Sequence, residues 1–469
     1  MKGSAATAIF AVAFGLRLLH LRAIMPLELG TPPVIGMDRW LSTHIAAAVA
    51  RGNWLGGWSA AYDSSPGYAL LLGVLHRAAG GGWLGPLCVQ AALGALVPLL
   101  LYGVGARLFS ARVGALAAGL AALYAPAIFY ETLLVKFALL PITVAAALAC
   151  VVRGRDERAA RWLVPAGMAL GALVLLRPNA LLTAAVMALW VIGPGAGLVW
   201  RAMAVGTRVA LGAALVAVPL VLHARAAGGE SGGEALWGIH FFIGTNPEAD
   251  GRYTEVPGVR DDIVGHVVDA RRIAEHDLGR PLVPGEVSRY WFEKGLGFVR
   301  EHPFRYLLLE ARKVWIALDG DEEGSFGDDF HDYRRASWVL RLPLPTFAAV
   351  GPLGLLGLCL TLVGRPRARV LHLFVASYLV CLLPFFVTGR YRLPLVPPML
   401  VLAAFALCWL EENIRRRRSR ALLGAAVLLG AATAGLASRE LLPGVAFTLA
   451  GGLGAAAALA RSDGGQSPA

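Results

Sequence analysis

The sequence predicts an all-α polytopic membrane protein, a bundle of about twelve transmembrane helices with one large extracytoplasmic insertion. Three observations predict this fold class. Of the 469 residues, 57% are hydrophobic and only 16% are charged, and the mean hydropathy is +0.62. Charge-free apolar runs long enough to cross a bilayer recur along the chain. Short clusters of basic residues separate many of those runs, which is the pattern that orients membrane proteins.

The predicted spans fall on both sides of one long polar region. They are residues 5–24, 84–107, 112–128, 132–152, 162–176, 180–199, 207–222, 344–363, 370–388, 393–411, 421–437 and 441–460. The first run follows Lys2, carries Arg17 and Arg22 towards its far end, and lacks a small-residue cleavage motif. We therefore interpret it as an uncleaved first helix and not as a signal peptide.

The distribution of basic residues predicts the orientation. With the N-terminus in the cytoplasm, one side collects most of the basic clusters, including the run 415–418. The short loops on the opposite side hold only Arg177, Arg390, Arg392 and Arg439. The positive-inside rule favours this arrangement. The first loop, 25–83, and the insertion, 223–343, then lie outside the cytoplasm.

The chain is accordingly divided into four parts. They are an N-terminal transmembrane module at 1–222, the extracytoplasmic insertion at 223–343, a C-terminal transmembrane module at 344–461, and a polar tail at 462–469 that we expect to be disordered. The first loop contains two predicted surface helices, 42–50 and 66–79. In the insertion, 260–277 and 286–300 are amphipathic, and 303–318 has the pattern of a helix in the membrane interface.

Two compositional features exclude other classes. The formal net charge is +12 and the pI is about 9.9, but the basic residues lie between apolar runs, which indicates membrane topology and not nucleic-acid binding. The five cysteines, Cys88, Cys150, Cys359, Cys381 and Cys408, lie in or beside apolar runs. They lack the paired spacing of a zinc site or a disulfide framework, so we interpret them as small core residues.

Ionisable residues at or near membrane depth are costly and are therefore candidates for function. Asp38 follows the first span, where a helix cap or a salt bridge with Arg39 is the competing explanation. Glu131 lies at the predicted outer mouth of the fourth span, and favourable placement of an anion at a helix N-terminus competes there. Lys136 follows about one and a half turns deeper, within reach of Glu131 or of the same cavity. Asp63 precedes the turn before 66–79, where helix capping is the alternative.

A second group of candidates is basic. Arg390, Tyr391 and Arg392 occupy the very short loop between the ninth and tenth spans. The two arginines oppose the charge bias of their side, so they either hold an anion or extend to lipid headgroups. Arg177, which precedes Pro178, is a similar but weaker case.

The insertion supplies further candidates. His240 and Asn246 belong to a segment of aromatic residues, glycines and asparagine, 237–247. Such a segment either lines a sugar or acceptor site or forms a buried strand that ends in a turn. The acidic run Asp319, Asp321, Glu322 and Glu323 lacks EF-hand spacing, and we interpret it as a solvated turn.

In their order along the chain, these motifs resemble the membrane glycosyltransferases of the GT-C fold. The bacterial branch similar to protein O-mannosyltransferases and lipid A aminosugar transferases is the most similar. The segments that carry the resemblance are Asp38–Gly52, Ser65–Leu72, Ile128–Leu134, Phe242–Gly251, Glu301–Pro303 and Arg390–Pro394. The sequence departs from the aminosugar-transferring branch at Ser65, where that branch carries a charged residue before the proline.

The resemblance implies an enzyme of the bacterial inner membrane that moves a sugar from a polyprenyl-phosphate donor to a hydroxyl of a lipid, glycan or protein acceptor on the extracytoplasmic side. It implies Asp38 as the base, Glu131 as an acidic group that shapes the site, and Arg390 and Arg392 as groups that hold the donor phosphate. Tyr391, Lys136 and Arg177 complete the expected phosphate-binding set, and Asp63, His240 and Asn246 are expected to bind substrate. It implies neither a metal nor a cofactor, because the first-loop site has no Asp-X-Asp pair and the resembled branch works without a divalent ion. No strong general acid is expected either, since a polyprenyl phosphate is already a good leaving group.

A transporter or lipid flippase is the alternative class, because about a dozen spans is typical there too. The position of the large polar insertion and of the acidic residues discriminates between a glycosyltransferase and a transporter. This chain places its large insertion and its acidic candidates outside, whereas transporters more often hold charged residues in the middle of spans, and Lys136 is the nearest such case. An inactive scaffold is a third possibility.

Overall fold

The computed structural model describes residues 3–54, 66–155, 157–193, 198–226, 232–322, 329–419, 421–426 and 429–430. Within these ranges the chain forms helices and no strand, so the predicted all-α class is confirmed. Three predictions concern residues outside the described part: the candidate Asp63, the last span at 441–460, and the tail at 462–469. The predicted span 421–437 is described only at its start.

Five helical segments are long and apolar enough to cross a membrane. They are α1 (Gly3–Glu28), α4 (Leu84–Leu108), η2 with α7 (Lys136–Gly154), Ala202–His223 within α10 (Leu198–Ala226), and η6 with α19 (Gly389–Arg415). Shorter apolar helices are α5 (Ala111–Leu123), α8 (Leu163–Leu176), α9 (Leu181–Ile192), α17 (Phe347–Thr361) and α18 (Arg369–Leu382). Every predicted span up to residue 411 overlaps one of these helices. The chain is therefore a multi-pass membrane protein.

The third and fourth predicted spans are interrupted where they were expected to be continuous. After α5, Tyr124 is extended, the short helix α6 (Ala125–Tyr130) follows, and a turn leads to η2 (Lys136–Leu139) and α7 (Leu140–Gly154). Pro126 and Pro141 occupy the first turns of α6 and α7, where a missing backbone N–H has no cost. Irregular backbone at such a depth requires burial within the protein or a cavity to line.

The apolar helices pack on one another as one bundle. Helix α4 contacts α1, α5 and α7, helix α8 contacts α7 and α10, and α17 packs against α19. The main core joins side chains from both transmembrane modules, among them Tyr130, Phe137, Phe374 and Leu400. The N- and C-terminal modules therefore share one hydrophobic core.

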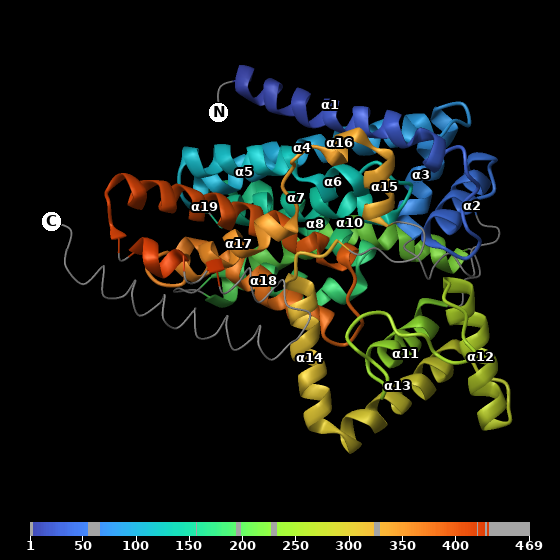
Figure 1. The fold of residues 1–469 in the computed structure, drawn as a ribbon. Coiled ribbons are helices and arrows are strands. Elements are labelled where there is room, and N and C mark those ends of the chain that lie inside the picture. Colours follow the sequence, from blue (N-terminus) through green and yellow to red (C-terminus); the bar gives the residue numbers. More distant parts are fainter. Residues whose placement is uncertain are drawn as a thin grey trace.

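The insertion forms a smaller helical unit beside this bundle (Figure 1). It comprises α11 (Gly232–Gly244), α12 (Ile263–Leu278), α13 (Pro284–Glu301) and α14 (Pro303–Leu318). The next two helices, α15 (Phe330–Ala336) and α16 (Trp338–Arg341), pack on α1 of the bundle. Helices α11, α12 and α13 have their own core, which includes Ile239, Ala270 and Trp291. Helix α14 has the bounds predicted for it and runs back to the bundle.

The first loop contains the two helices expected in it, α2 (Asp38–Ala50) and α3 (Pro66–Ala78), which pack on each other. Helix α2 begins earlier than the predicted 42–50. This places Asp38 in its first turn, where the helix dipole stabilises a carboxylate.

One secondary-structure alternative was wrong. The segment 237–247 belongs largely to α11 and is not a buried strand. Buried Leu236, Ile239 and Ile243 recur at helical spacing and face the core that α11 shares with α13. The sequence left a buried strand open as an alternative, because periodicity alone does not distinguish a short buried strand from a buried helix.

Candidate functional site

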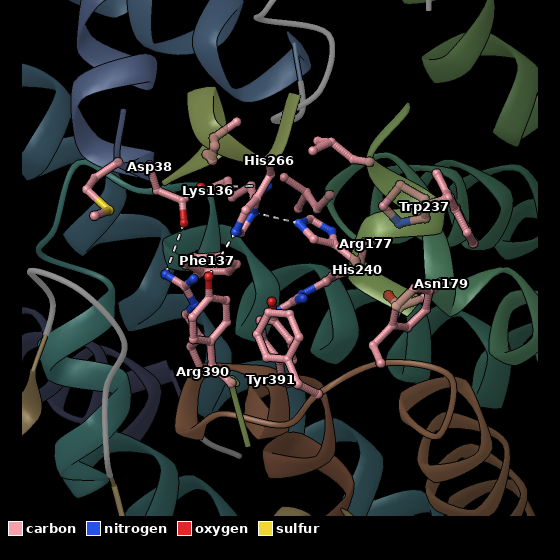
Figure 2. A pocket seen from close by; sticks show the side chains of 18 of the residues that line it. Asp38, Lys136, Phe137, Arg177, Asn179, Trp237, His240, His266, Arg390 and Tyr391 are labelled. Carbon is pink, nitrogen blue, oxygen red and sulfur yellow. Dashed lines mark hydrogen bonds and ion pairs between the residues drawn. The ribbon is translucent and has the colours of Figure 1, made fainter. Parts of the chain in front are cut away.

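A cavity of about 460 Å³ lies between the bundle and the insertion. Its polar and ionisable lining consists of Asp38, Lys136, Arg177, Asn179, His240, Tyr253, Asp261, Asp262, His266, Arg390 and Tyr391. These residues come from α2, η2, the turn after α8, the insertion and η6. Segments far apart in the sequence therefore converge here (Figure 2), and six of the predicted site residues are among them.

Arg177 is a buried cation with unused hydrogen-bond donors. The residue is 8% exposed, and its Nε and Nη2 have no hydrogen-bond partner in the part of the chain that the structure describes. Its guanidinium stacks against aromatic rings, 3.9 Å from the ring centroid of Tyr391 and 4.9 Å from that of Phe137. Because a guanidinium carries five N–H donors and a permanent charge, this environment favours an anion.

Asp38 is held by two cations at the same end of the cavity. Arg390 Nη1 donates to Asp38 Oδ2 at 3.0 Å, the pair drawn in Figure 2, and Lys136 Nζ lies 3.8 Å from Oδ1. The expected alternative partner, Arg39, pairs instead with Glu28 at 3.1 Å. The salt bridge with Arg39 considered for Asp38 was therefore wrong.

Asp38 also lines a second cavity, of about 240 Å³. The lining of this cavity includes Glu28, Arg39, Asp332 and Tyr333. Glu28 is held by hydrogen bonds from the backbone N–H of Leu134 at 2.9 Å and from the hydroxyl of Tyr333 at 3.1 Å. Asp38 is thus part of the boundary between the two cavities.

Glu131 lies away from both cavities. It is fully buried, and its Oε2 accepts a hydrogen bond from Arg17 Nε at 2.5 Å. It is the residue that ends α6, and not the start of a helix as its alternative explanation required. The structure therefore places it in a buried ion pair that joins α1 to the turn before η2.

Arg392 also turns away from the cavity. It is 1% exposed, its Nη2 donates to Asp319 Oδ1 at 2.9 Å, and it donates to the backbone carbonyls of Asp319 and Asp321. Asp319 and Glu322 are buried, and that burial raises the pKa of both carboxyl groups while Arg392 opposes the rise. The acidic run is therefore a buried anchor for Arg392, and the solvated turn expected there was wrong. Glu323 lies outside the described residues.

Asn246 does not line the cavity either. Its Nδ2 donates to the carbonyls of Phe242 and Ile243, and its Oδ1 accepts from the N–H of Glu248 at 2.8 Å. All three bonds close the end of α11. The structure thus gives Asn246 a local structural role in place of the predicted contact with substrate.

The wall of the cavity contains a chain of hydrogen bonds that was not predicted from the sequence. His240 Nε2 lies 3.2 Å from His266 Nδ1, His266 Nε2 lies 3.0 Å from the Tyr253 hydroxyl, and that hydroxyl donates to Asp261 Oδ1 at 3.1 Å. Burial lowers the pKa of His266 to about 4 and lowers the pKa of His240 well below its ordinary value. Among these four residues, only His240 stood in a recognised motif, because the others are joined by tertiary contacts alone.

Among the described residues, no group of three or more histidine, cysteine, aspartate or glutamate side chains is placed to hold a metal ion. The side chains that line the cavity supply three carboxylates, Asp38, Asp261 and Asp262, and three cations. A string of polar groups runs from Tyr253 through His266 to His240.

No protein-family model and no curated protein matches the chain. Solved structures that are similar to it include ArnT from Cupriavidus metallidurans in the apo state, with a TM-score of 0.48 and 18% identity over 97% of this chain and 76% of that one. The same protein bound to undecaprenyl phosphate gives a TM-score of 0.46 and 18% identity over 98% and 77%.

The Archaeoglobus fulgidus oligosaccharyltransferase AglB, in complex with an inhibitory peptide and a dolichol-phosphate, gives a TM-score of 0.42 and 14% identity over 97% of this chain and 56% of that one. The chain thus spans about half the length of AglB and about three quarters of ArnT. Both solved proteins are GT-C glycosyltransferases, the class that the sequence motifs resemble.

Proposed function

We propose that this chain is a membrane glycosyltransferase that moves a sugar from a polyprenyl-phosphate donor to an acceptor hydroxyl in the cavity beside Asp38. The observation that carries the proposal is Arg177, a buried guanidinium with unused donors in the cavity that also holds the Asp38–Arg390 pair. A buried cation of this kind is costly unless an anion accompanies it. A lipid phosphate supplies that anion.

The phosphate end of the cavity contains Lys136, Arg177 and Arg390. A polyprenyl-phosphate sugar is a phosphodiester with one negative charge. When the bond between the anomeric carbon and the phosphate oxygen breaks, its electron pair stays on the phosphate, which gains a second charge. Cations held around the phosphate therefore stabilise the transition state more than the bound substrate.

Asp38 is the proposed base. As the acceptor oxygen bonds to the anomeric carbon, its proton passes to the Asp38 carboxylate, and no acid is needed for the departing phosphate. Before the donor binds, Arg390 and Lys136 contact Asp38. A bound phosphate competes for both cations and so leaves a carboxylate oxygen available to the acceptor, which we place in the second cavity.

The wall of the cavity is suited to a lipid donor. Besides the cations it is lined by apolar side chains, among them Val174, Leu175, Phe385 and Phe386. Its lining residues come from segments predicted to lie outside the cytoplasm and from predicted spans next to those segments. These features support a site on the extracytoplasmic side of the bacterial inner membrane. Undecaprenyl phosphate, a bacterial polyprenyl phosphate, is a suitable probe.

The test is binding of undecaprenyl phosphate to the purified full chain in nanodiscs. A charge-assisted hydrogen bond is worth about 1.5 to 3 kcal/mol, so Arg177→Ala should weaken binding by about ten- to a hundredfold. Arg177→Lys should recover only part of the loss, because a lysine lacks the paired donors. Arg208→Ala is the matched control, since Arg208 is exposed and donates to a carbonyl of its own helix.

Unchanged binding in Arg177→Ala would refute the phosphate site. Formation of a glycosylated product separates a transferase from a flippase, the alternative class, because a flippase binds the same lipid without cleaving it. Binding without any product from a panel of sugar donors and acceptors would favour the flippase.

A further inference from the structure

The hydrogen-bond chain from Asp261 to His240 has a defined direction. The Tyr253 hydroxyl donates to Asp261, so its oxygen is left to accept from the Nε2–H of His266. In that tautomer His266 Nδ1 carries a lone pair, which accepts from the Nε2–H of His240. In this tautomer the Nδ1 of His240 is a hydrogen-bond acceptor, and within the part of the chain that the structure describes the ring has a hydrogen bond to His266 alone.

Burial keeps both histidines neutral, and the nearby charges are smaller influences. Burial is the largest influence on the pKa of His240 and lowers it. The positive charges of Lys136 and Arg390 and the neighbouring His266 lower this pKa further, whereas Asp38 raises it. His266 is also governed by burial, which outweighs the opposite influence of Asp261 and Asp262. The cavity therefore presents an uncharged imidazole.

Aromatic faces surround this imidazole. Trp237 lies three residues before His240 on α11, is 47% exposed and lines the cavity. Its ring meets that of Phe385 edge to face with centroids 5.7 Å apart, and Phe386 meets the imidazole of His240 in the same way at 6.0 Å. Figure 2 shows Trp237 and His240 away from the Asp38–Arg390 pair. An uncharged acceptor among aromatic faces suits a sugar ring, which has apolar C–H faces and hydroxyl edges.

We infer that His240 is a specificity-determining residue whose Nδ1 accepts a hydrogen bond from a hydroxyl of an uncharged donor sugar, and that Asp261, Tyr253 and His266 are positioning residues that fix its tautomer. The inference rests on the proposed function and names its substrate class. A cationic amino sugar is disfavoured beside His240, because the positive charges of Lys136 and Arg390 near this ring would repel it.

The first experiment tests the chain without any enzymatic activity. Nitrogen-15 NMR of the full chain in nanodiscs, labelled at histidine and assigned with His240→Asn and His266→Asn, reports the tautomer of each ring. At pH 7 we expect neutral rings with the proton on Nε2 for both histidines. Tyr253→Phe should give a mixture of tautomers at His266. A proton on Nδ1 of His240, or a doubly protonated ring at pH 7, would overturn the inference even if the protein transfers sugar.

The second experiment measures kinetics with undecaprenyl-phosphate mannose and glucose, and with the same lipid carrying glucosamine. His240→Ala should lower kcat/KM for the better neutral donor by about ten- to a hundredfold, because one hydroxyl loses its acceptor. His240→Asn, which keeps an oxygen acceptor near the position of Nδ1, should recover part of the loss. Tyr253→Phe should raise KM for that donor several-fold with little change in kcat.

Tyr290→Phe is the matched control, because Tyr290 belongs to the same insertion but its hydroxyl donates to the exposed Asp277 at the surface. Equal effects of Tyr253→Phe and Tyr290→Phe, or a preference for the glucosamine donor, would contradict the inference. If no donor is turned over, the proposed function fails, while the NMR result still decides the tautomer of His240.

Discussion

At the scale of single residues, the short loop before α19 places Arg390 and Arg392 in different environments. Arg390 pairs with Asp38 in the cavity, whereas Arg392 is buried against Asp319. The loop is a 3₁₀ helix, Gly389–Leu395. With about three residues per turn, side chains two positions apart point in different directions. Both arginines are unusual on a side of the membrane with few basic residues, but for different reasons. Arg390 belongs to the candidate ligand site, and Arg392 is a structural anchor.

The two arginines should respond differently to removal. Arg392→Ala removes the buried cation beside Glu322 and leaves buried Asp319 with Arg252 alone, so we expect a loss of about 3 to 5 kcal/mol in stability. Arg390→Ala should fold normally and bind undecaprenyl phosphate about ten- to a hundredfold more weakly. Thermal unfolding and lipid binding of the purified variants distinguish the two. If Arg392→Ala has normal stability but binds the lipid weakly, Arg392 would be a phosphate-binding residue and not a structural anchor.

Replacement of the proposed base should separate chemistry from folding. Asp38→Asn retains the size of the side chain but removes its capacity to take the acceptor proton, so we expect sugar transfer to be abolished while expression and thermal stability are retained. Asp277→Asn is the control, because Asp277 is exposed and lines neither cavity. Transfer by Asp38→Asn within a few-fold of wild type would exclude Asp38 as the base.

Glu131 was expected to shape the catalytic site, and its role is testable through its partner. Glu131→Ala leaves the fully buried Arg17 uncompensated, so stability should fall by about 3 to 5 kcal/mol. Replacing both residues, as Arg17→Met with Glu131→Leu, should restore most of the stability, because well-packed apolar residues often substitute for a buried pair. A stable double variant that has lost transfer would favour the catalytic role.

At the scale of elements, the packing of α11 on α13 positions the sugar end of the cavity. Gly238 of α11 lies against α13, where its N–H donates to Ser288 Oγ at 3.0 Å and a Cβ would overlap the carbonyl oxygen of Ser288. Trp237 and His240 flank this contact on the same helix. A shift of α11 would therefore carry both side chains with it.

Gly238→Ala should consequently impair the site as well as stability. Overpacking typically costs about 1 to 3 kcal/mol, and we expect lower thermal stability with a raised KM for the sugar donor. Gly297→Ala on α13 is the control, because a Cβ there meets nothing within 4 Å. Equal behaviour of the two variants in unfolding and in donor KM would show that the α11–α13 contact does not position the site.

The insertion should also lose stability in acid. The pKa of His266 is lowered by burial from 6.5 to about 4, so between these values the unfolded chain binds a proton that the folded chain does not. Stability therefore falls as pH decreases from 6.5 towards 4, by about 3 kcal/mol from this residue. His240 and Tyr253 contact His266, and Asp261 and Asp262 oppose the shift.

Hydrogen exchange of the backbone amides in α11, α12 and α13 measures this pH dependence. Replacement by His266→Gln should flatten the profile, whereas replacement of the exposed His276 by Gln should leave it unchanged. A profile in wild type that does not change between pH 6.5 and 4 would contradict the assignment of His266 as a neutral buried ring.

At the scale of the whole molecule, the predicted topology can be measured directly. We expect the insertion outside the cytoplasm, so a cysteine at the exposed Glu255 should react with an impermeant thiol reagent in intact cells. The nearby exposed Gly258 is unsuitable for this substitution, because its φ of +82° strains any other residue. A cysteine at exposed Arg367, in a predicted inner loop, should react only after lysis. The reverse pattern would invert the topology and the proposed side of the site.

The sequence by itself determined the class of the molecule and the positions of most helices. Apolar runs are local and long, so lipid as solvent forces them into helices whose bounds are readable, and α14 was predicted to the residue. Ionisable residues near membrane depth, such as Asp38 and Arg390, could also be recognised as candidates from the sequence alone. Only the tertiary structure decided which of those residues meet, because Arg390 and Asp38 are 352 positions apart. The tertiary structure also buries Glu131 and Arg392 in the core, and it links His240 to Asp261 through hydrogen bonds. The choice of partner depends on packing between distant segments, and local hydrophobicity and charge carry no information about that packing.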